Sequence, residues 1–197
     1  SGCLNTVWNR TGDIGRVIAG EKRRIQLDTP EGMNTRPTQD RIKETLFNMI
    51  GPDIAGRRFV DLFAGSGQMG IEALSRGAEF AYFFEADNKA LTCIKNNLDK
   101  TDLNHVSQIY SGDIFSAIKN ISNVDSIDYV FMDPPYDNLY EKKILQRLID
   151  FESIDKYTTI IVEASLDTDF SYLSDLCYEL IKEKTYKTNK HVFIQKV

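Results

Sequence analysis

The chain has 197 residues, a length that suits one well-packed domain with a small appendage. Hydrophobic residues make up 42% and charged residues 27%, as in an ordinary soluble globular protein, and no apolar stretch approaches the roughly 20 residues of a transmembrane helix. Cys3, Cys93 and Cys177 lie far apart without a CxxC pair, which argues against a disulfide framework and a zinc site. We therefore expect a protein of the reducing cytoplasm, with no bound metal and no contact with a membrane.

The net charge of −5 argues against nucleic-acid binding only as an average. Residues 1–58 hold 10 lysines and arginines against 7 acidic residues, whereas the remainder holds 14 against 22. A local basic face on an acidic body can still bind phosphate, because salt screens the distant charges. A merely solvated charged face explains the pattern equally well. The basic residues concerned are Arg16, Lys22, Arg23, Arg24, Arg36, Arg41 and Lys43.

The N-terminal part predicts a small extension to a larger domain. Residues 1–15 show no periodicity and are expected to be a flexible leader or an added remnant. Residues 16–27 alternate loosely around a glycine turn, which favours a short hairpin. A helix is predicted over residues 40–50, with Thr38 as its N-cap and Gly51-Pro52 after its end.

From residue 58 onward, strands and helices alternate. This alternation predicts a doubly wound, mostly parallel α/β sheet of seven strands, closed at one edge by an antiparallel C-terminal hairpin. We accordingly divide the chain into a hairpin-and-helix extension, residues 16–57, and a main domain, residues 58–197. The predicted strands are 59–63, 80–85, 106–110, 127–132, 158–163, 178–186 and 191–197, and the predicted helices are 68–75, 88–98, 114–118, 141–151 and, weakly, 170–176.

A glycine loop follows the first strand of this domain and opens a helix. Residues 61–70 read DLFAGSGQMG and contain the spacing Gly65-x-Gly67-x-x-Gly70, which lets a backbone turn tightly and approach a ligand. Glu85 closes the next strand, where an acidic side chain can accept hydrogen bonds from a ribose. The combination favours nucleotide-type binding over a structural turn. NAD and S-adenosylmethionine (SAM) both suit it.

Two further acidic residues fit the second of these ligands. SAM carries no phosphate, and Asp61, just before the loop, could face its positively charged amino-acid tail. Asp113 follows the third strand, where its carboxylate could accept a hydrogen bond from an adenine amino group. Asp113 could also cap the helix that begins at Ile114.

The motif Asp133-Pro134-Pro135-Tyr136 follows a buried strand, at the edge where a parallel sheet presents its ligand crevice. The two prolines stiffen the loop, so that a carboxylate is held on one side of it and an aromatic ring on the other. Hydrogen-bond acceptors beside a ring that can stack suit a flat substrate that carries an amino group. A proline-rich loop with a capping aspartate is the alternative.

These motifs together resemble class I SAM-dependent methyltransferases, and more narrowly the bacterial 16S rRNA guanine-N2 methyltransferase family known as RsmD. The residues that carry the resemblance are the segment RPTQDRIKETLFN at 36–48, the run from Asp61 to Gly77, and the DPPY motif at 133–136. The resemblance covers roughly residues 16–197, although the hairpin carries charged residues where the family often has glycines. It implies a SAM cofactor and, as partner, 16S rRNA or a small-subunit assembly particle.

The resemblance also implies roles for individual residues. It implies that the DPPY residues Asp133, Pro134, Pro135 and Tyr136 receive the guanine, with its exocyclic N2 at the carboxylate and its ring stacked on the tyrosine. The N-terminal segment would hold RNA through Lys22, Arg23, Arg24, Arg36, Thr38 and Arg41, with pairing to an acidic residue of the core as the alternative for Arg36. SAM would be bound by Asp61, Phe63, Ala64, Gly65, Ser66, Gly67, Glu85, Ala86, Asp113 and Ile114.

Three other functions remain open at this point. DNA adenine-N6 methyltransferases can also carry DPPY, but they usually add a target-recognition region, for which little chain is left here. A nicotinamide-dependent oxidoreductase has no support beyond the glycine spacing. The third is a non-catalytic RNA-binding assembly factor, although the glycines and the aromatic residue of the motif are intact. We expect a monomer that modifies RNA.

Overall fold

The computed structural model describes residues 15–30, 37–136 and 139–197. The predictions for the leader before Gly15 and for Arg36 therefore lie outside the described residues. The strands are β1 (Gly15–Arg16), β2 (Gln26–Leu27), β3 (Arg58–Leu62), β4 (Phe80–Glu85), β5 (Ser107–Ser111), β6 (Tyr129–Met132), β7 (Thr159–Ser165), β8 (Tyr178–Thr185) and β9 (Asn189–Lys196). The α-helices are α1 (Pro37–Ile50), α2 (Gln68–Ser75), α3 (Asn88–Thr101), α4 (Ile114–Ala117) and α5 (Tyr140–Leu148), and the 3-10 helices are η1 (Gly51–Ile54), η2 (Asn104–Val106), η3 (Ile118–Ile121) and η4 (Ser171–Leu176).

The main sheet has the predicted seven strands, and the structure gives their order as β5-β4-β3-β6-β7-β9-β8. Strands β3 to β7 pair in parallel, and β9 pairs antiparallel with both β7 and β8. The chain runs outward from β3 to β5 and then returns to β6 on the other side of β3. This reversal makes the gap between β3 and β6 the topological switch point, where open α/β sheets bind ligands.

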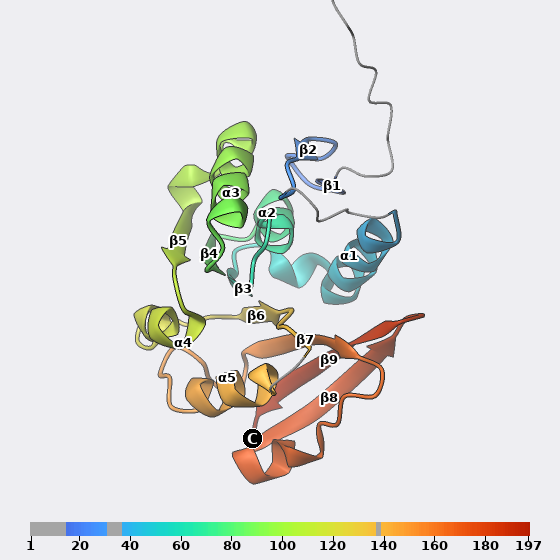
Figure 1. Cartoon of the computed structure of the whole chain (residues 1–197), viewed down its shortest axis with the longest axis vertical. Helices are drawn as coiled ribbons and strands as arrows, with labels where there is room; N and C mark the ends of the chain where they lie inside the picture. The colour runs from blue at the N-terminus through green and yellow to red at the C-terminus, as the bar shows by residue number, and fades with distance from the viewer. Residues whose placement is uncertain (1–14, 31–36, 137–138) are drawn as a thin grey trace, which may run out of the picture.

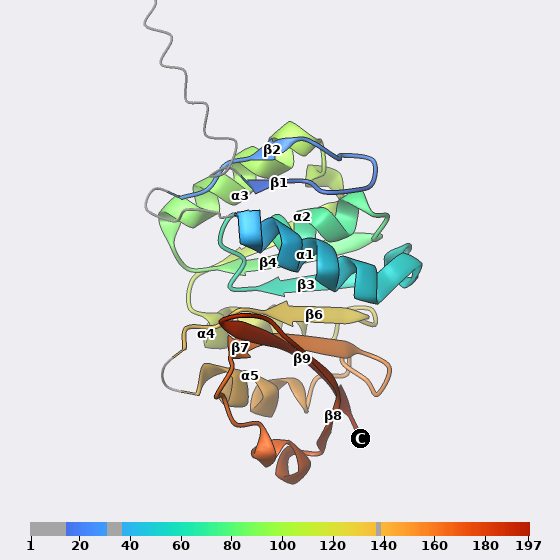
Figure 2. The same cartoon turned by 90° about the vertical axis from the view of Figure 1, so that its right-hand side faces the viewer.

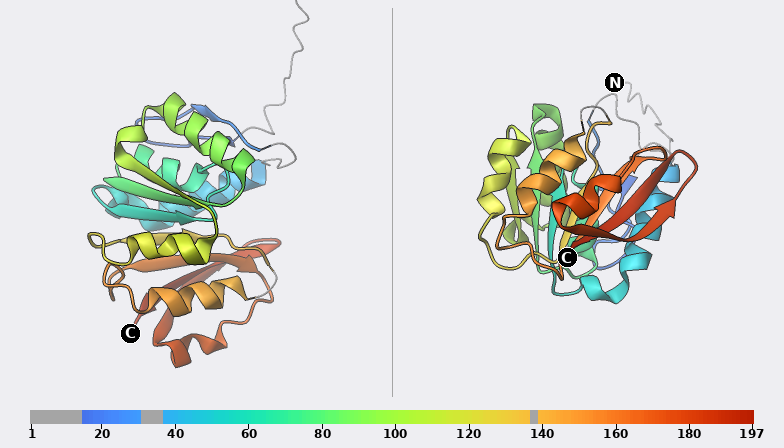
Figure 3. Two further views of the ribbon diagram at one scale, coloured as in Figure 1. Left: turned by 60° about the vertical axis from the view of Figure 1, so that its left-hand side comes forward. Right: turned by 90° about the horizontal axis from the view of Figure 1, so that it is seen from below.

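Helices cover both faces of the sheet (Figures 1 and 3). On one face, α4, α5 and η4 pack over apolar residues that alternate along the strands, such as Val60, Val130 and Val162. On the other face, α1, α2 and α3 pack over the intervening positions, such as Phe59 and Phe83. Both alternating sets are buried, so these strands are near-continuous apolar runs, as expected for a parallel sheet between two helical layers.

The N-terminal extension docks on α2 through buried polar contacts. The Glu72 carboxylate, with no exposed surface, accepts hydrogen bonds from the backbone N–H groups of Ile18 and Ala19 at 2.9 and 3.1 Å. Lys43 of α1 is only 3% exposed and lies 4.0 Å from Glu72. Ser75 receives the backbone N–H of Lys22 at 2.9 Å. Figure 2 shows β1, β2 and α1 along the α2 side of the sheet.

Four local expectations from the sequence need correction. Lys43 is buried and holds the extension in place, so it does not belong to a basic face. Helix α1 begins at Pro37, which places Thr38 inside the first turn and not at the N-cap. Strand β3 ends at Leu62, because Phe63 adopts a left-handed φ of 58° to enter the glycine loop. The weak helix predicted at 170–176 is the 3-10 helix η4.

Candidate active site

The glycine loop between β3 and α2 needs its three glycines for two different reasons. Gly65 and Gly67 have φ values of 59° and 82°, which residues with a Cβ rarely adopt. A Cβ on Gly65 would meet no atom within 4 Å, so the loop backbone there is open to a ligand. A Cβ on Gly70 would stand 2.3 Å from the Phe83 ring, so this glycine lets α2 pack closely on β4. These are the roles that a nucleotide-binding glycine loop requires.

Asp61 supports the loop from below. It is 1% exposed, and its Oδ2 accepts the backbone N–H of Gly70 at 3.0 Å. Burial raises the pKa of the Asp61 carboxyl to about 8, and the nearby charge of Glu85 acts in the same direction. Asp61 therefore holds the backbone of the first turn of α2, directly after the glycine loop.

Glu85 joins the ends of β3 and β4. Its Oε1 accepts the Gly65 N–H at 2.8 Å, and its Oε2 accepts the N–H groups of Ala86 and Asp87 at 2.9 and 3.0 Å. A carboxylate has about four acceptor positions, so about one remains for a ligand. The remaining position lies on Oε1, where a ribose hydroxyl could donate a hydrogen bond.

The third acidic position lies at the end of β5. The Asp113 side chain accepts the Ser116 backbone N–H at 3.1 Å, which confirms the predicted N-cap of α4. Asp113 is exposed and Ile114 beside it is buried, so a polar and an apolar group are offered together at this edge. The rings of Phe63 and Phe115 both contact Tyr140, with centroid distances of 6.2 and 6.0 Å.

This arrangement fits SAM. The open backbone at Gly65, the carboxylates of Glu85 and Asp113, and the apolar side chain of Ile114 follow three neighbouring strands at their carboxyl ends. They supply the acceptors and apolar contacts that a nucleoside with a sulfonium tail needs. The loop residues Ala64 and Ser66 hold its shape, since the Ala64 N–H bonds to Phe84 O and the Ser66 carbonyl accepts the Asn97 amide, each at 2.9 Å.

The DPPY motif stands on the other side of the switch point. Leu62, which precedes the glycine loop, pairs with Met132, which precedes Asp133. The two motifs therefore leave adjacent parallel strands at the same edge of the sheet. Pro134 is buried and anchors the turn, whereas the Tyr136 side chain is 69% exposed and has its ring available for stacking.

A second carboxylate, which sequence reasoning missed, lies beside Asp133. The pairing of Met132 with Val162 brings Glu163 of β7 next to Asp133. The Asp133 residue keeps exposed surface, but the protein packed around its carboxyl group raises the pKa of that group to about 8, and the Glu163 charge adds to the rise. Burial alone would raise the pKa of Glu163 as well, but the hydrogen bond and charge of His191 outweigh burial and lower it.

The predicted RNA-binding residues differ in how accessible they are. Arg23, Arg24 and Arg41 are exposed, whereas the Lys22 side chain is only 21% exposed. The Thr38 side chain, like Arg36, lies outside the part that the structure describes. Arg16 of the same basic group is exposed and lies 3.6 Å from Asp40, so its charge is partly paired.

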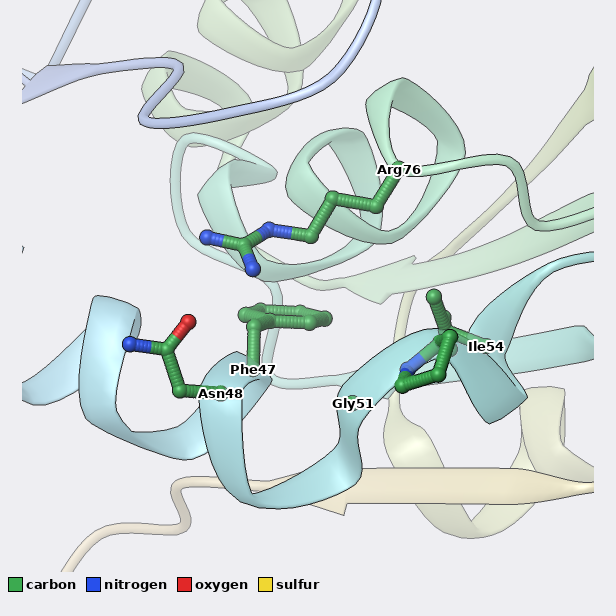
Figure 4. Close-up of a pocket in the computed structure, with 6 residues that line it drawn as sticks. Phe47, Asn48, Gly51, Ile54 and Arg76 are labelled. Carbon is green, nitrogen blue, oxygen red and sulfur yellow. The ribbon is translucent and has the colours of Figure 1, made fainter.

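A hollow of about 440 Å³ at the far end of α1 is not part of this site (Figure 4). It lies where α1 passes through η1 into the start of β3, at the edge opposite the carboxyl ends. The Arg76 guanidinium lies 5.2 Å above the Phe47 ring and bonds to Glu72 at 2.9 Å, so it is occupied in packing. The lining residues are Phe47, Asn48, Gly51, Pro52, Ile54 and Arg76.

Several residues that shape the site gave no signal in the sequence. Asn97 is fully buried and binds both the Ser66 carbonyl and the backbone of Asp28, which links the glycine loop to the extension. Glu163 lies in a strand whose β-branched residues indicate only a buried strand, and His191 has no other histidine or motif near it in the sequence. Their partners come from other strands, so sequence spacing does not reveal them.

Comparison with known proteins agrees with this geometry. The model of the family described as "Conserved hypothetical protein 95" matches residues 15–195. The "Ribosomal RNA small subunit methyltransferase D" of Haemophilus influenzae is 33% identical over 178 residues, which are 90% of this chain and 91% of that protein. "Putative rRNA methyltransferase YlbH" of Bacillus subtilis is 40% identical over 149 residues, 75% of this chain and 81% of the relative.

A solved structure of a similar protein has the same fold. "Putative methyltransferase yhhF" from Escherichia coli superposes with a TM-score of 0.79 at 28% identity, over 93% of this chain and 98% of that one. The sheet order, the glycine loop and the DPPY motif at the switch point define a class I methyltransferase, the class whose methyl donor is SAM. Within this class the chain belongs to the "Conserved hypothetical protein 95" family, which is the RsmD family that its motifs resemble.

Proposed function

We propose that this protein transfers a methyl group from SAM to the exocyclic N2 of a guanine in small-subunit ribosomal RNA. The observation that carries the proposal is the pairing of Leu62 with Met132, because it sets the glycine loop and the DPPY motif on neighbouring strand ends. A methyl donor on the loop and a planar amine on the motif would meet across this gap. The class of RNA is inferred from the relatives, which are named as rRNA methyltransferases, one of them of the small subunit.

The cofactor half of the site would be formed by the residues after β3, β4 and β5. Phe63 to Gly67 would lie under SAM, Glu85 and Ala86 would take its ribose, and Asp113 with Ile114 would take its adenine. Asp61 would act through the loop backbone that it holds at Gly70. Bound SAM would supply a methyl group that its sulfonium already activates.

The acceptor half would position and activate the amine. The N2 of guanine is a poor nucleophile, because its lone pair is delocalised into the ring. Hydrogen bonds from N2–H to the Asp133 carboxylate and the Pro134 carbonyl would favour a more pyramidal nitrogen, while Tyr136 stacks on the flipped-out base. In-line placement can lower such a barrier by several kcal/mol. As the N–C bond forms and the methyl–sulfur bond breaks, the N2 proton would pass to Asp133 and then to water.

The extension would hold the RNA. Arg23, Arg24 and Arg41 are exposed around the hairpin and α1, and arginines at such positions contact phosphates without reading sequence. Among the described residues, no helix is long and apolar enough to cross a membrane. The substrate would be met in the cytoplasm, as free 16S rRNA or within an assembling small subunit, by a monomer of this chain.

Methylation of adenine N6 in DNA is the second candidate, since the DPPY motif alone fits any planar amine. The test offers labelled SAM to naked small-subunit RNA, immature small subunits, DNA and protein. We expect label in an RNA substrate only and N2-methylguanosine after digestion to nucleosides. Label in DNA, or in no RNA species, would overturn the proposal.

Asp133→Asn examines the acceptor carboxylate. The amide keeps the shape and one acceptor oxygen but cannot take the N2 proton, so we expect turnover to fall by about 10²- to 10⁴-fold, as when a positioned general base is lost. SAM affinity should stay unchanged, because Asp133 lies across the gap from the glycine loop. Near-unchanged turnover would remove Asp133 from the mechanism.

A further inference from the structure

Asp133, directly after β6, forms one row at the edge of the sheet with a side chain of β7 and a side chain of β9. Glu163 of β7 pairs directly with His191 of the antiparallel β9, and the His191 Nε2 lies 2.7 Å from the Glu163 Oε1. On its other side, Glu163 lies next to Asp133, because Met132 and Val162, the residues just before them, are paired. The order along the row is therefore Asp133, Glu163, His191, beginning at the DPPY motif.

His191 is built into the sheet as a support. It has no exposed surface, and the rings of Phe131 and Tyr186 meet its ring edge-on at centroid distances of 5.9 and 5.2 Å. The Nδ1 atom has no hydrogen-bond partner in the part of the chain that the structure describes. Its Nε2 therefore carries the one polar contact among these residues, which fixes the Glu163 carboxylate on the side away from Asp133.

Glu163 keeps free acceptor capacity toward the crevice. A carboxylate offers about four acceptor positions, and the His191 contact takes one of them. The Glu163 side chain is 18% exposed, so a substrate can reach it. Asp133 and Glu163 together present two neighbouring carboxyl groups to whatever base lies on the DPPY motif.

Two adjacent acceptors distinguish guanine from adenine. The Watson–Crick edge of guanine carries two donors side by side, N1–H and N2–H, whereas adenine carries a donor at N6 beside an acceptor at N1. With N2–H donated to Asp133, the base can lie with its N1–H toward β7, the next strand of the sheet, where Glu163 is. An acceptor at that position can bind the guanine N1–H. It repels adenine, because the adenine N1 lone pair would face an oxygen that also carries lone pairs.

We propose that Glu163, held by His191, is the specificity-determining residue that accepts the guanine N1–H while Asp133 receives the N2 amino group. The inference rests on the proposed function and explains a choice that the DPPY motif cannot make by itself. The competing interpretation is that Glu163 and His191 only fasten the C-terminal hairpin to β7.

The experiment uses RNA with either guanosine or 2-aminopurine riboside at the modified position, once that position has been mapped. 2-Aminopurine keeps the N2 amine but has a bare acceptor at N1. The wild-type chain should prefer guanosine by at least about 100-fold in kcat/KM, because a site built for an N–H rejects an analogue that lacks it. Equal use of the two substrates would overturn the inference without any variant.

Glu163→Gln then turns the acceptor into a group that can also donate. The preference for guanosine should shrink by at least about tenfold, since the glutamine amide can donate to the N1 of 2-aminopurine. A loss of activity in equal proportion on both substrates would show a structural role and refute the inference. The ratio is measured within one preparation, so a partly unfolded variant does not distort it.

The matched control is Glu183→Gln on β8, which removes another hairpin carboxylate, 3.4 Å from Lys190. It should leave the preference unchanged. Failure of the proposed function has a different signature, because the wild-type chain would then methylate no guanosine in the RNA at all.

Discussion

Replacing Glu72 by glutamine tests how the N-terminal extension is held on the domain. The Glu72 carboxylate is fully buried and accepts the N–H groups of Ile18 and Ala19 and the Arg76 Nε at 2.9 to 3.1 Å. Lys43, only 3% exposed, lies 4.0 Å away. Glutamine has nearly the same shape, so the change removes the charge and one acceptor oxygen without opening a cavity.

The expected loss in the free energy of unfolding depends on the buried groups that Glu72→Gln leaves without a partner. Breaking a buried ion pair by removing one partner costs about 3 to 5 kcal/mol, because the other charge remains buried. A backbone N–H that loses its acceptor costs about 1 to 3 kcal/mol. These contacts share one side chain and do not add, so we expect a loss of about 4 kcal/mol in the free energy of unfolding. In a chain of this size that lowers Tm by on the order of 10 °C.

Urea and thermal unfolding, followed by circular dichroism, measure this loss. Glu79→Gln is the control: its carboxylate is 60% exposed and lies 3.7 Å from Arg58, and such a surface pair contributes about 0 to 1 kcal/mol. RNA affinity should fall further than SAM affinity in the Glu72 variant, since the docked hairpin loses its support. Equal unfolding midpoints for the two variants would refute the reasoning.

Three other outcomes follow from the geometry. Since the surrounding protein raises the pKa of Asp133 to about 8, kcat/KM should rise with pH below about 8 and level off above it. The Glu163→Gln variant should reach its plateau at a lower pH, because the Glu163 charge contributes to the raised pKa. A flat profile of kcat/KM from pH 6 to 9 would contradict this prediction. Gly70→Ala, whose Cβ would stand 2.3 Å from a ring atom, should cost about 2 kcal/mol in urea unfolding; wild-type stability would argue against the tight helix–strand contact. Replacing both Arg23 and Arg24 by glutamine should weaken RNA binding and reduce its log–log salt slope by about 1 to 2, with SAM affinity unchanged; an unchanged slope would exclude phosphate contacts there.

Much of the fold and half of the candidate site could be read from local patterns. The glycine spacing, the acidic residues after β4 and β5, and the DPPY motif each follow a strand. Because parallel strands end at one edge, a correct alternation of strands and helices already gathers these motifs. The limits of α2 and β4 agree with prediction, since apolar periodicity is strongest where an element is buried. The start of α1 was misplaced because Pro37 suits the first helical position, where no N–H is needed.

The sequence by itself determined which motifs meet at the edge of the sheet: a glycine loop after one strand and the stiff DPPY segment after its neighbour. Only the tertiary structure decided which charged side chains become neighbours. Lys43 looks like any surface lysine until α1 packs against α2 and buries it beside Glu72. Glu163 and His191 are 28 residues apart, and antiparallel pairing of β7 with β9 makes them neighbours. A motif shows its function through local spacing, whereas the pairing of buried charges depends on which distant segments the packed core brings together.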